Sequence, residues 1–280
     1  MVESLDEQLK DETLDHETRA QIGEELNRIG DTRAGVGLRP DGLPDIAWCR
    51  VDVSAEKRLF RNERGQVYGE FVLKPFSIAK YPVTYQQFRA FHESPDGFNN
   101  EQWWEGLTEK YRQQEILDQR APYDNHPRDS VSWYQAVAFA RWLDAKYAGE
   151  MPSTEIRLPL EWEWQWAAQG YDERSYPWGK PEYRFANTRE CRLGRTTAVG
   201  VYPQGQAWCG ALDMSGNVWE WCLNEYATPT HAAYEGHNSR VLRGGSFVDV
   251  AEWAVCGSRF NDLPNRRLDY FGFRVVRVTR

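Results

Sequence analysis

Five cysteines and five histidines are the side chains of this 280-residue chain best suited to bind a metal or attack a substrate. The cysteines are Cys49, Cys191, Cys209, Cys222 and Cys256. They are odd in number and form no CxxC pair, whereas zinc sites and disulfide frameworks need paired cysteines. The histidines are scattered without the spacing of metal ligands. We therefore expect the cysteines to be small buried hydrophobic side chains.

The charge balance excludes some classes of partner. The formal net charge is −8, so a basic surface that neutralises phosphates is not expected, and nucleic acid is excluded as a ligand. No run of about 18 apolar residues is present, which argues against membrane insertion. The first ten residues are polar and lack a signal-peptide core. These features predict a cytoplasmic protein.

Apolar periodicity divides the chain into two parts. Residues 17–29 place Ile22, Leu26 and Ile29 on one narrow stripe, which predicts a helix. A loop rich in Gly and Pro follows, so we expect a helical N-terminal segment and linker over residues 1–45. A single domain is then expected over residues 46–280.

Capping signals predict where the helices of this domain begin. Thr84 and Ser132 each have a Gln three residues later, the pattern of a capping box. Further helices are expected over residues 107–117 and between Pro159 and Gly170. Strands are expected over residues 48–53 and 66–73. The last hundred residues alternate turns, Gly and short apolar runs, and these predict an irregular antiparallel sheet.

Several motifs occur in one order along the domain. They are VSWYQAVAFARWL (131–143), RLPLEWEWQWAAQG (157–170), YPWG (176–179), LDMSGNVWEW (212–221), VLRGGSF (241–247) and GFRVVR (272–277). Together they resemble the formylglycine-generating enzyme, or sulfatase-modifying factor, family. The resemblance implies an α+β C-type lectin fold, in which helices pack on an irregular, twisted antiparallel sheet with long loops.

The resemblance also implies a catalytic site that this sequence lacks. Enzymes of the family use two cysteines after RGGS to bind copper, and soft thiolates suit Cu(I). Here Val248, Asp249, Val250 and Ala254 stand in that segment, and only Cys256 remains. Related iron-dependent sulfoxide synthases add a His-rich helical domain, which is not expected here. We therefore predict that the chain is not an enzyme and requires no cofactor.

The family often holds structural calcium through amide, carboxylate and carbonyl oxygens, the ligands that this hard cation prefers. By this resemblance Asn217, Val218 and Glu220 are candidate calcium ligands, and Asn187 matches the start of a second site. The alternative is that Asn217 supports a tight turn and Glu220 forms an ion pair.

The C-terminus resembles a narrower group, the variable proteins of diversity-generating retroelements. In that group the 3′ end of the gene is rewritten at adenines of Asn codons, which cannot yield Lys, Glu, Gln, Met or Trp. Three blocks in residues 243–280 avoid those five residues, and Ser258 is a further candidate. The implied ligand-binding positions are Val248, Asp249, Val250, Ser258, Phe260, Asn261, Asp262, Leu263, Leu268, Asp269 and Tyr270.

These positions combine aromatic and apolar anchors with carboxylate acceptors, which is typical of a binding surface. The main hypothesis is a non-catalytic protein that displays a diversified surface to an unknown protein or peptide. One alternative is a formylglycine-generating or related metal-dependent oxidase. Another is an inactive accessory domain of a bacterial signalling protein, with a signalling module upstream.

Overall fold

The computed structural model describes residues 2–111 and 114–280. Its helices are α1 (Val2–Gln8), α2 (His16–Ile29), α3 (Tyr85–Glu93), α4 (Trp133–Tyr147) and α5 (Glu161–Gln169). Its strands are β1 (Trp48–Val51), β2 (Lys57–Arg61), β3 (Val67–Val72), β4 (Phe76–Ala79), β5 (Thr154–Arg157), β6 (Trp219–Glu225), β7 (Arg240–Arg243), β8 (Phe260–Asp262), β9 (Phe271–Gly272) and β10 (Val276–Thr279). Short 3₁₀ turns occupy several of the long connections.

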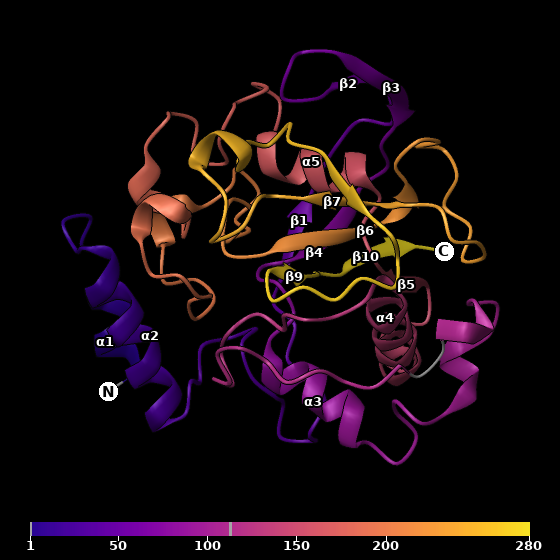
Figure 1. The fold of residues 1–280 in the computed structure, drawn as a ribbon, viewed down its shortest axis with the longest axis horizontal. Coiled ribbons are helices and arrows are strands. Elements are labelled where there is room, and N and C mark those ends of the chain that lie inside the picture. Colours follow the sequence, from indigo (N-terminus) through magenta and orange to yellow (C-terminus); the bar gives the residue numbers. More distant parts are fainter. Residues whose placement is uncertain (1, 112–113) are drawn as a thin grey trace.

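Two four-stranded sheets form the centre of the domain (Figure 1). The first has the order β1-β4-β10-β5 and is antiparallel throughout. The second has the order β8-β7-β6-β9. The hairpin of β2 and β3 forms a separate ribbon, which projects from the top of the molecule in Figure 1. The C-terminal strand β10 therefore lies between β4 and β5, two strands that come much earlier in the chain.

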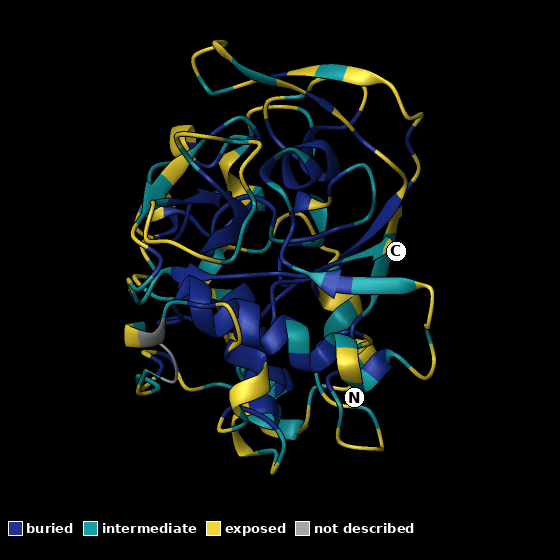
Figure 2. Ribbon diagram, turned by 90° about the vertical axis from the view of Figure 1, so that its right-hand side faces the viewer, coloured by how far each residue is buried: buried dark blue, intermediate teal, exposed yellow. Residues whose placement is uncertain are grey.

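Strand β6 is buried along its whole length because both of its faces are covered. Trp219, Trp221 and Leu223 belong to one apolar core, whereas Cys222 belongs to the other. Successive side chains of a strand point to opposite faces, which explains this division. Figure 1 shows α5 above strands β6 and β7, and α4 with α3 below them. Figure 2 shows buried residues in the middle of the molecule and exposed ones mainly in the outer loops.

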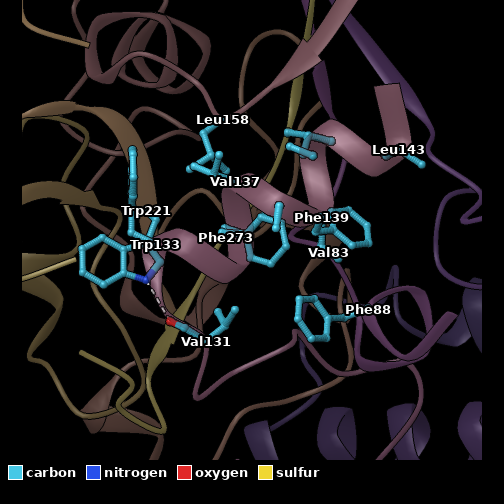
Figure 3. Close-up of a cluster of buried hydrophobic side chains, with 14 of the residues drawn as sticks. Val83, Phe88, Val131, Trp133, Val137, Phe139, Leu143, Leu158, Trp221 and Phe273 are labelled. Carbon is cyan, nitrogen blue, oxygen red and sulfur yellow. Dashed lines mark hydrogen bonds between the residues drawn. The ribbon is translucent and has the colours of Figure 1, made fainter. Parts of the chain in front are cut away.

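The larger core is aromatic and lies around α4 (Figure 3). Phe139 packs edge-on against Phe91 and Phe273, with ring centroids 5.9 and 5.4 Å apart. Trp221 also donates its indole N–H to the carbonyl of Val131 at 2.9 Å. Buried indoles need such a partner, and here the partner joins β6 to the residue just before α4.

Both predicted capping boxes are confirmed. Thr84 and Gln87 cap α3, and Ser132 and Gln135 cap α4, through reciprocal side-chain and backbone hydrogen bonds. The predicted helix before Gly170 is also present as α5, where the glycine takes a positive φ of 67° that favours Gly. These local signals were sufficient because each can be satisfied within four residues.

Two expectations were wrong. Residues 107–117 form no α-helix in their described part, but a 3₁₀ turn over Glu109–Tyr111; residues 112–113 lie outside the described residues. The second sheet is also not purely antiparallel, because β6 and β9 pair in parallel through Trp219–Phe271 and Glu220–Gly272. No local pattern signals that pairing, since it joins residues about fifty positions apart.

The N-terminal helices pack directly on the domain. Ile22 and Leu26 of α2 share a small core with Ala198, Val201 and Tyr202. The boundary predicted near residue 45 remains a prediction. Within residues 2–111 and 114–280, no helix is long and apolar enough to cross a membrane.

A fully buried ion pair joins the two sheets. Both carboxylate oxygens of Glu220 on β6 accept hydrogen bonds from Arg274, at 2.6 and 2.7 Å, and neither side chain has exposed surface. Trp164 of α5 donates its indole N–H to the same carboxylate at 2.7 Å. Arg274 also donates to the carbonyls of Ala79 and Leu212. One glutamate therefore connects α5, β6 and the segment that leads into β10.

We expect the substitution Glu220→Gln to lower the free energy of unfolding by about 3–5 kcal/mol, because Arg274 would stay buried without a counter-charge. Urea unfolding followed by tryptophan fluorescence measures this change. The double variant Glu220→Leu with Arg274→Met removes both charges and is expected to recover much of the loss. A single variant as stable as the parent would mean that the carbonyl partners alone satisfy Arg274.

Candidate functional site

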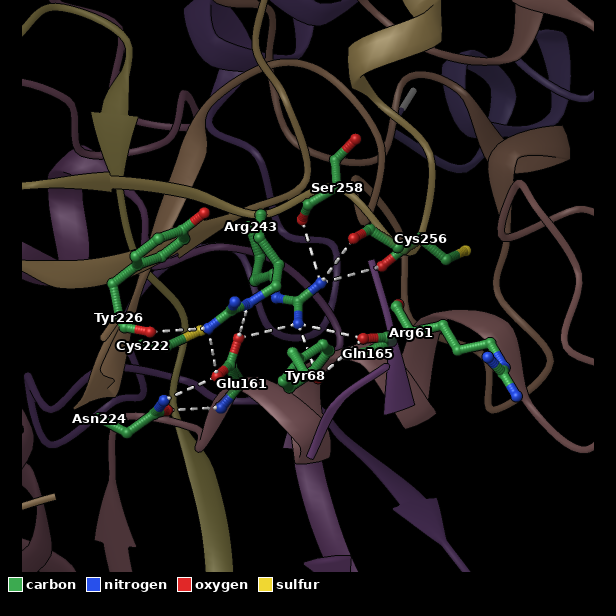
Figure 4. A network of polar contacts seen from close by, with 12 residues as sticks. Arg61, Tyr68, Glu161, Gln165, Cys222, Asn224, Tyr226, Arg243, Cys256 and Ser258 are labelled. Carbon is green, nitrogen blue, oxygen red and sulfur yellow. Dashed lines mark hydrogen bonds and ion pairs between the residues drawn. The ribbon is translucent and has the colours of Figure 1, made fainter. Parts of the chain in front are cut away.

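The motif RGGSF begins a long loop, whose two ends are tied together by one buried glutamate (Figure 4). Glu161, in the first turn of α5, accepts a hydrogen bond from Arg243 at 3.0 Å. The same carboxylate accepts from Arg259 at 2.6 and 2.9 Å. Arg243 ends β7 and Arg259 precedes β8. The pair of arginines therefore closes residues 244–258 into a loop with fixed ends.

Contacts to backbone atoms also hold the interior of this loop. Arg243 donates to the carbonyls of Gly257 and Ser258 at 3.2 and 3.0 Å. Gly245 has a φ of 73°, and a Cβ at this position would lie 2.9 Å from the Cα of Ala254. Only glycine allows this approach, so the two arms of the loop pack closely. The result is a pre-formed platform on which the residues at its edge keep fixed positions.

Aromatic and acidic side chains meet at the edge of this platform. Trp219 donates its indole N–H to the carboxylate of Asp249 at 2.8 Å, and the Ser246 hydroxyl donates to the same oxygen. The ring of Phe260 lies beside that of Trp219, with centroids 5.3 Å apart. We call Trp219, Asp249, Phe260 and the neighbouring Tyr270 the aromatic–acidic surface.

Tyr270 is the residue on which the charges of this surface converge. Partial burial raises the pKa of its phenol, and the carboxylates of Asp249, Asp269 and Asp262 raise it further. Asp269 also pairs with Arg120 at 2.7 Å, and Asp262 lies 3.6 Å from Arg266. At neutral pH the phenol therefore keeps its proton and can donate a hydrogen bond.

The other predicted ligand-binding residues differ in how far they are exposed. Val248 and Leu263 are exposed, and Val250 is half-buried. Asn261 pairs with Val241 within the sheet, and Leu268 packs against the larger core. Ser258 is fully buried beneath the loop, so it cannot touch a ligand in this conformation.

Sequence reasoning did not include Trp219 among the ligand-binding positions. Its side chain is almost fully buried, at 3% exposure. It contributes to this surface through its indole N–H, which holds the Asp249 carboxylate. No neighbouring residue signals this contact, because the partner lies thirty residues away.

The candidate calcium ligands do not converge on one point. The Asn217 side chain accepts from the backbone N–H of Thr197 at 3.0 Å and supports a turn in which Asn217 has a φ of 68°. Glu220 instead holds Arg274, so a guanidinium stands where a cation would bind this carboxylate. Asn187, by contrast, has a buried side-chain oxygen without a hydrogen-bond partner among the described residues. Calcium binding stays a prediction.

The cysteines were expected to be buried, and three of them are: Cys191, Cys222 and Cys256. Cys49 and Cys209 are partly exposed. Burial raises the pKa of the Cys256 thiol, so the one cysteine of the 248–256 segment is not disposed to form a thiolate. The residues present therefore do not fit a two-cysteine copper site.

Another buried acid, Asp129, lies in the segment that leads into α4. It is fully buried, and burial raises its pKa to about 7, with the nearby carboxylate of Asp269 adding to the shift. The preceding Arg128 opposes the shift. Ser130 binds the adjoining segment, since its N–H donates to the Leu268 carbonyl at 3.1 Å.

The raised pKa of Asp129 predicts a dependence of stability on pH. The folded protein keeps the proton where the unfolded chain, with its ordinary pKa of 3.8, has lost it. Stability is therefore lost as the pH rises from about 4 through about 7, by on the order of 4 kcal/mol. We expect Asp129→Asn to unfold at a higher temperature than the parent at pH 8, and similarly to it at pH 4. Equal pH profiles would contradict this.

Comparison with known proteins places this geometry in a family. A model described as a sulfatase-modifying factor enzyme 1-like domain matches residues 53–279. Hercynine oxygenase from Mycolicibacterium thermoresistibile is 30% identical over 89% of this chain, which spans 63% of the length of that protein. Formylglycine-generating enzyme from Thermomonospora curvata is 29% identical, over 72% of this chain and 82% of that protein.

Among solved structures, Treponema denticola variable protein 1 superposes with a TM-score of 0.60 over 82% of this chain and 94% of its own. Its sequence is 22% identical, so this similarity supports the fold alone. The predicted α+β C-type lectin fold is confirmed.

The same comparisons overturn the main functional hypothesis. The prediction of a non-catalytic, diversified binding protein is wrong, and so is the prediction that the chain is not an enzyme, because these sequence relatives are an oxygenase and a formylglycine-generating enzyme. The error came from treating the missing cysteine pair as a loss of all oxidation chemistry. With its model covering residues 53–279, the chain belongs to the sulfatase-modifying factor enzyme 1-like, or formylglycine-generating enzyme, family.

Proposed function

We propose that the chain is the substrate-binding domain of an oxygen-dependent oxidase, and that the aromatic–acidic surface binds a cationic group of its substrate. The reaction class rests on the similarity to hercynine oxygenase and formylglycine-generating enzyme. The chain spans less than two thirds of the hercynine oxygenase, so activity and substrate are part of this proposal. The observation that carries it is that Trp219 contacts both the Asp249 carboxylate and the exposed ring of Phe260, so a negative charge and an aromatic face lie close together.

The chemistry of the surface selects a positive charge. The faces of aromatic rings attract cations, most strongly quaternary ammonium groups, which lack N–H donors. Asp249 adds a fixed negative charge, since Trp219 and Ser246 both donate to it. Hercynine carries a quaternary ammonium group and therefore has the chemistry that such a surface recognises.

The residues around Asp249 would fix the orientation of a bound substrate. Asp249 precedes the 3₁₀ turn Ala251–Trp253, and its backbone carbonyl accepts from the backbone N–H of Arg189 at 2.8 Å. The Tyr270 phenol, protonated at neutral pH, can donate a hydrogen bond to an anionic group of the substrate. A betaine, with a cationic and a carboxylate end, would be oriented by both. Because the residues do not fit a two-cysteine copper site, we assign no step to copper.

We expect the protein to bind hercynine in isothermal titration calorimetry and the variant Asp249→Asn to bind it about tenfold more weakly or worse, because the attraction between the carboxylate and the ammonium charge would be lost. The matched control is Asp52→Asn, an exposed carboxylate on another part of the domain. Tetramethylammonium should compete with hercynine.

A separate assay measures turnover as oxygen consumption. The reaction contains hercynine and a thiol, and either Fe(II) or Cu(I) is added. Oxygen uptake that depends on hercynine supports an oxygenase of this kind. Uptake with a cysteine-containing peptide alone would favour the formylglycine-generating reaction. Absence of hercynine binding, or binding unchanged by Asp249→Asn, would refute the proposed role of the surface.

A further inference from the structure

A polar pocket of about 410 Å³ lies on the sheet of β1, β4, β10 and β5, and it does not depend on the proposed function. Strands β1, β4 and β10 contribute Arg50, Ser77 and Arg277 to it, and the loop that precedes β5 forms a wall with Met151 and Pro152. None of the described residues that line the pocket is acidic, although the chain carries a net charge of −8. The pocket is therefore a basic region on an acidic protein.

The strand register places two arginines on either side of one hydroxyl. Arg50 of β1 lies directly opposite Ser77 of β4, and Arg277 of β10 lies opposite the same serine on its other side. Side chains of directly opposed residues point to the same face of a sheet. The two arginines start two strand spacings apart, about 10 Å. Both long side chains can therefore reach an anion that sits above the Ser77 hydroxyl.

The charge of Arg277 is not balanced by a carboxylate of the described residues. Its guanidinium donates to the Met151 sulfur at 2.8 Å and to the Ser77 hydroxyl at 3.4 Å, and it lies 5.0 Å from the centroid of the Trp48 ring. All three partners are neutral, and a thioether is only a weak acceptor. An arginine held in this way keeps its attraction for an anion.

Arg50 is paired only weakly. Its one ion pair with a described residue is with Asp52 at 2.7 Å, and the two side chains are 78% and 66% exposed. Exposed pairs of this kind contribute little, so Arg50 can also contact a ligand. The nearby Arg280, by contrast, pairs with Asp144 at 2.6 Å. Arg50 and Arg277 are therefore the two guanidinium groups available to an anion in this pocket.

The number and kind of donors decide which anion fits. Four hydroxyl side chains line the pocket: Ser77, Ser153, Thr154 and Thr279. One guanidinium is enough to bind a carboxylate through two parallel hydrogen bonds, whereas a phosphate group carries up to two charges and three acceptor oxygens. Pockets of this volume hold a small organic molecule rather than a bare ion. We infer that the pocket binds the phosphate group of a small phosphate ester, held by Arg50, Ser77 and Arg277.

The test uses the full chain and two probes with the same ring, phenyl phosphate and benzoate, in isothermal titration calorimetry at pH 8. We expect phenyl phosphate to bind about tenfold more tightly than benzoate, and inorganic phosphate to compete with it. Arg50→Gln should weaken the binding of phenyl phosphate about fivefold, the effect of one charge at contact distance in water. Arg277→Gln should weaken it about tenfold or more, because this side chain is less exposed. Asp52→Asn should strengthen binding about twofold, since it frees Arg50 from a weak pair.

Matched controls separate this site from general attraction to positive charge and from the proposed function. Arg64→Gln removes an arginine that is 71% exposed in the β2–β3 turn, and it should bind phenyl phosphate like the parent. Asp249→Asn should also leave this binding unchanged, since it alters only the aromatic–acidic surface. Arg50 is exposed, so its variant is expected to fold even if Arg277→Gln does not. The inference is overturned if phenyl phosphate does not bind, if benzoate binds as tightly, or if Arg64→Gln weakens binding as much as Arg50→Gln does.

Discussion

The buried ion pair of Glu220 and Arg274 is the constraint on which the rest of the domain depends. Two opposite charges without exposed surface are tolerated only when every hydrogen-bonding atom finds a partner. Here the partners come from α5, β6, the end of β4 and the segment before β6, so satisfying the pair requires all four to be in place.

A second buried ionic group fixes the two ends of the loop over residues 244–258. Glu161 faces Arg243 and Arg259, and the additional positive charge is shared with carbonyls and with the rings of Tyr68 and Tyr226, 4.2 and 4.4 Å from the Arg259 guanidinium. A loop of fifteen residues with free ends would sample many conformations. Fixing both ends at one carboxylate reduces that entropy, so Asp249 and Phe260 are presented in constant positions.

The absence of the cysteine pair after RGGS excludes one kind of metal site but does not decide whether the chain is an enzyme. Val248, Asp249, Val250 and Ala254 exclude a two-cysteine copper site at this segment, and that conclusion follows from side-chain chemistry alone. They do not exclude oxidation by other means, and the sequence relatives are enzymes. The aromatic and acidic character of the C-terminal residues suits a substrate as well as a protein ligand.

The sequence by itself determined the elements whose signals are local and the family to which the motifs belong. The capping boxes at Thr84 and Ser132 and the stop at Gly170 are examples, because each depends on neighbouring residues only. Tertiary structure alone decided the parallel pairing of β6 with β9, the burial of Ser258, the commitment of Glu220 to Arg274 and the contact between Trp219 and Asp249. Each of these joins residues distant in sequence or depends on what covers them, and no periodicity records which distant partner a side chain will meet.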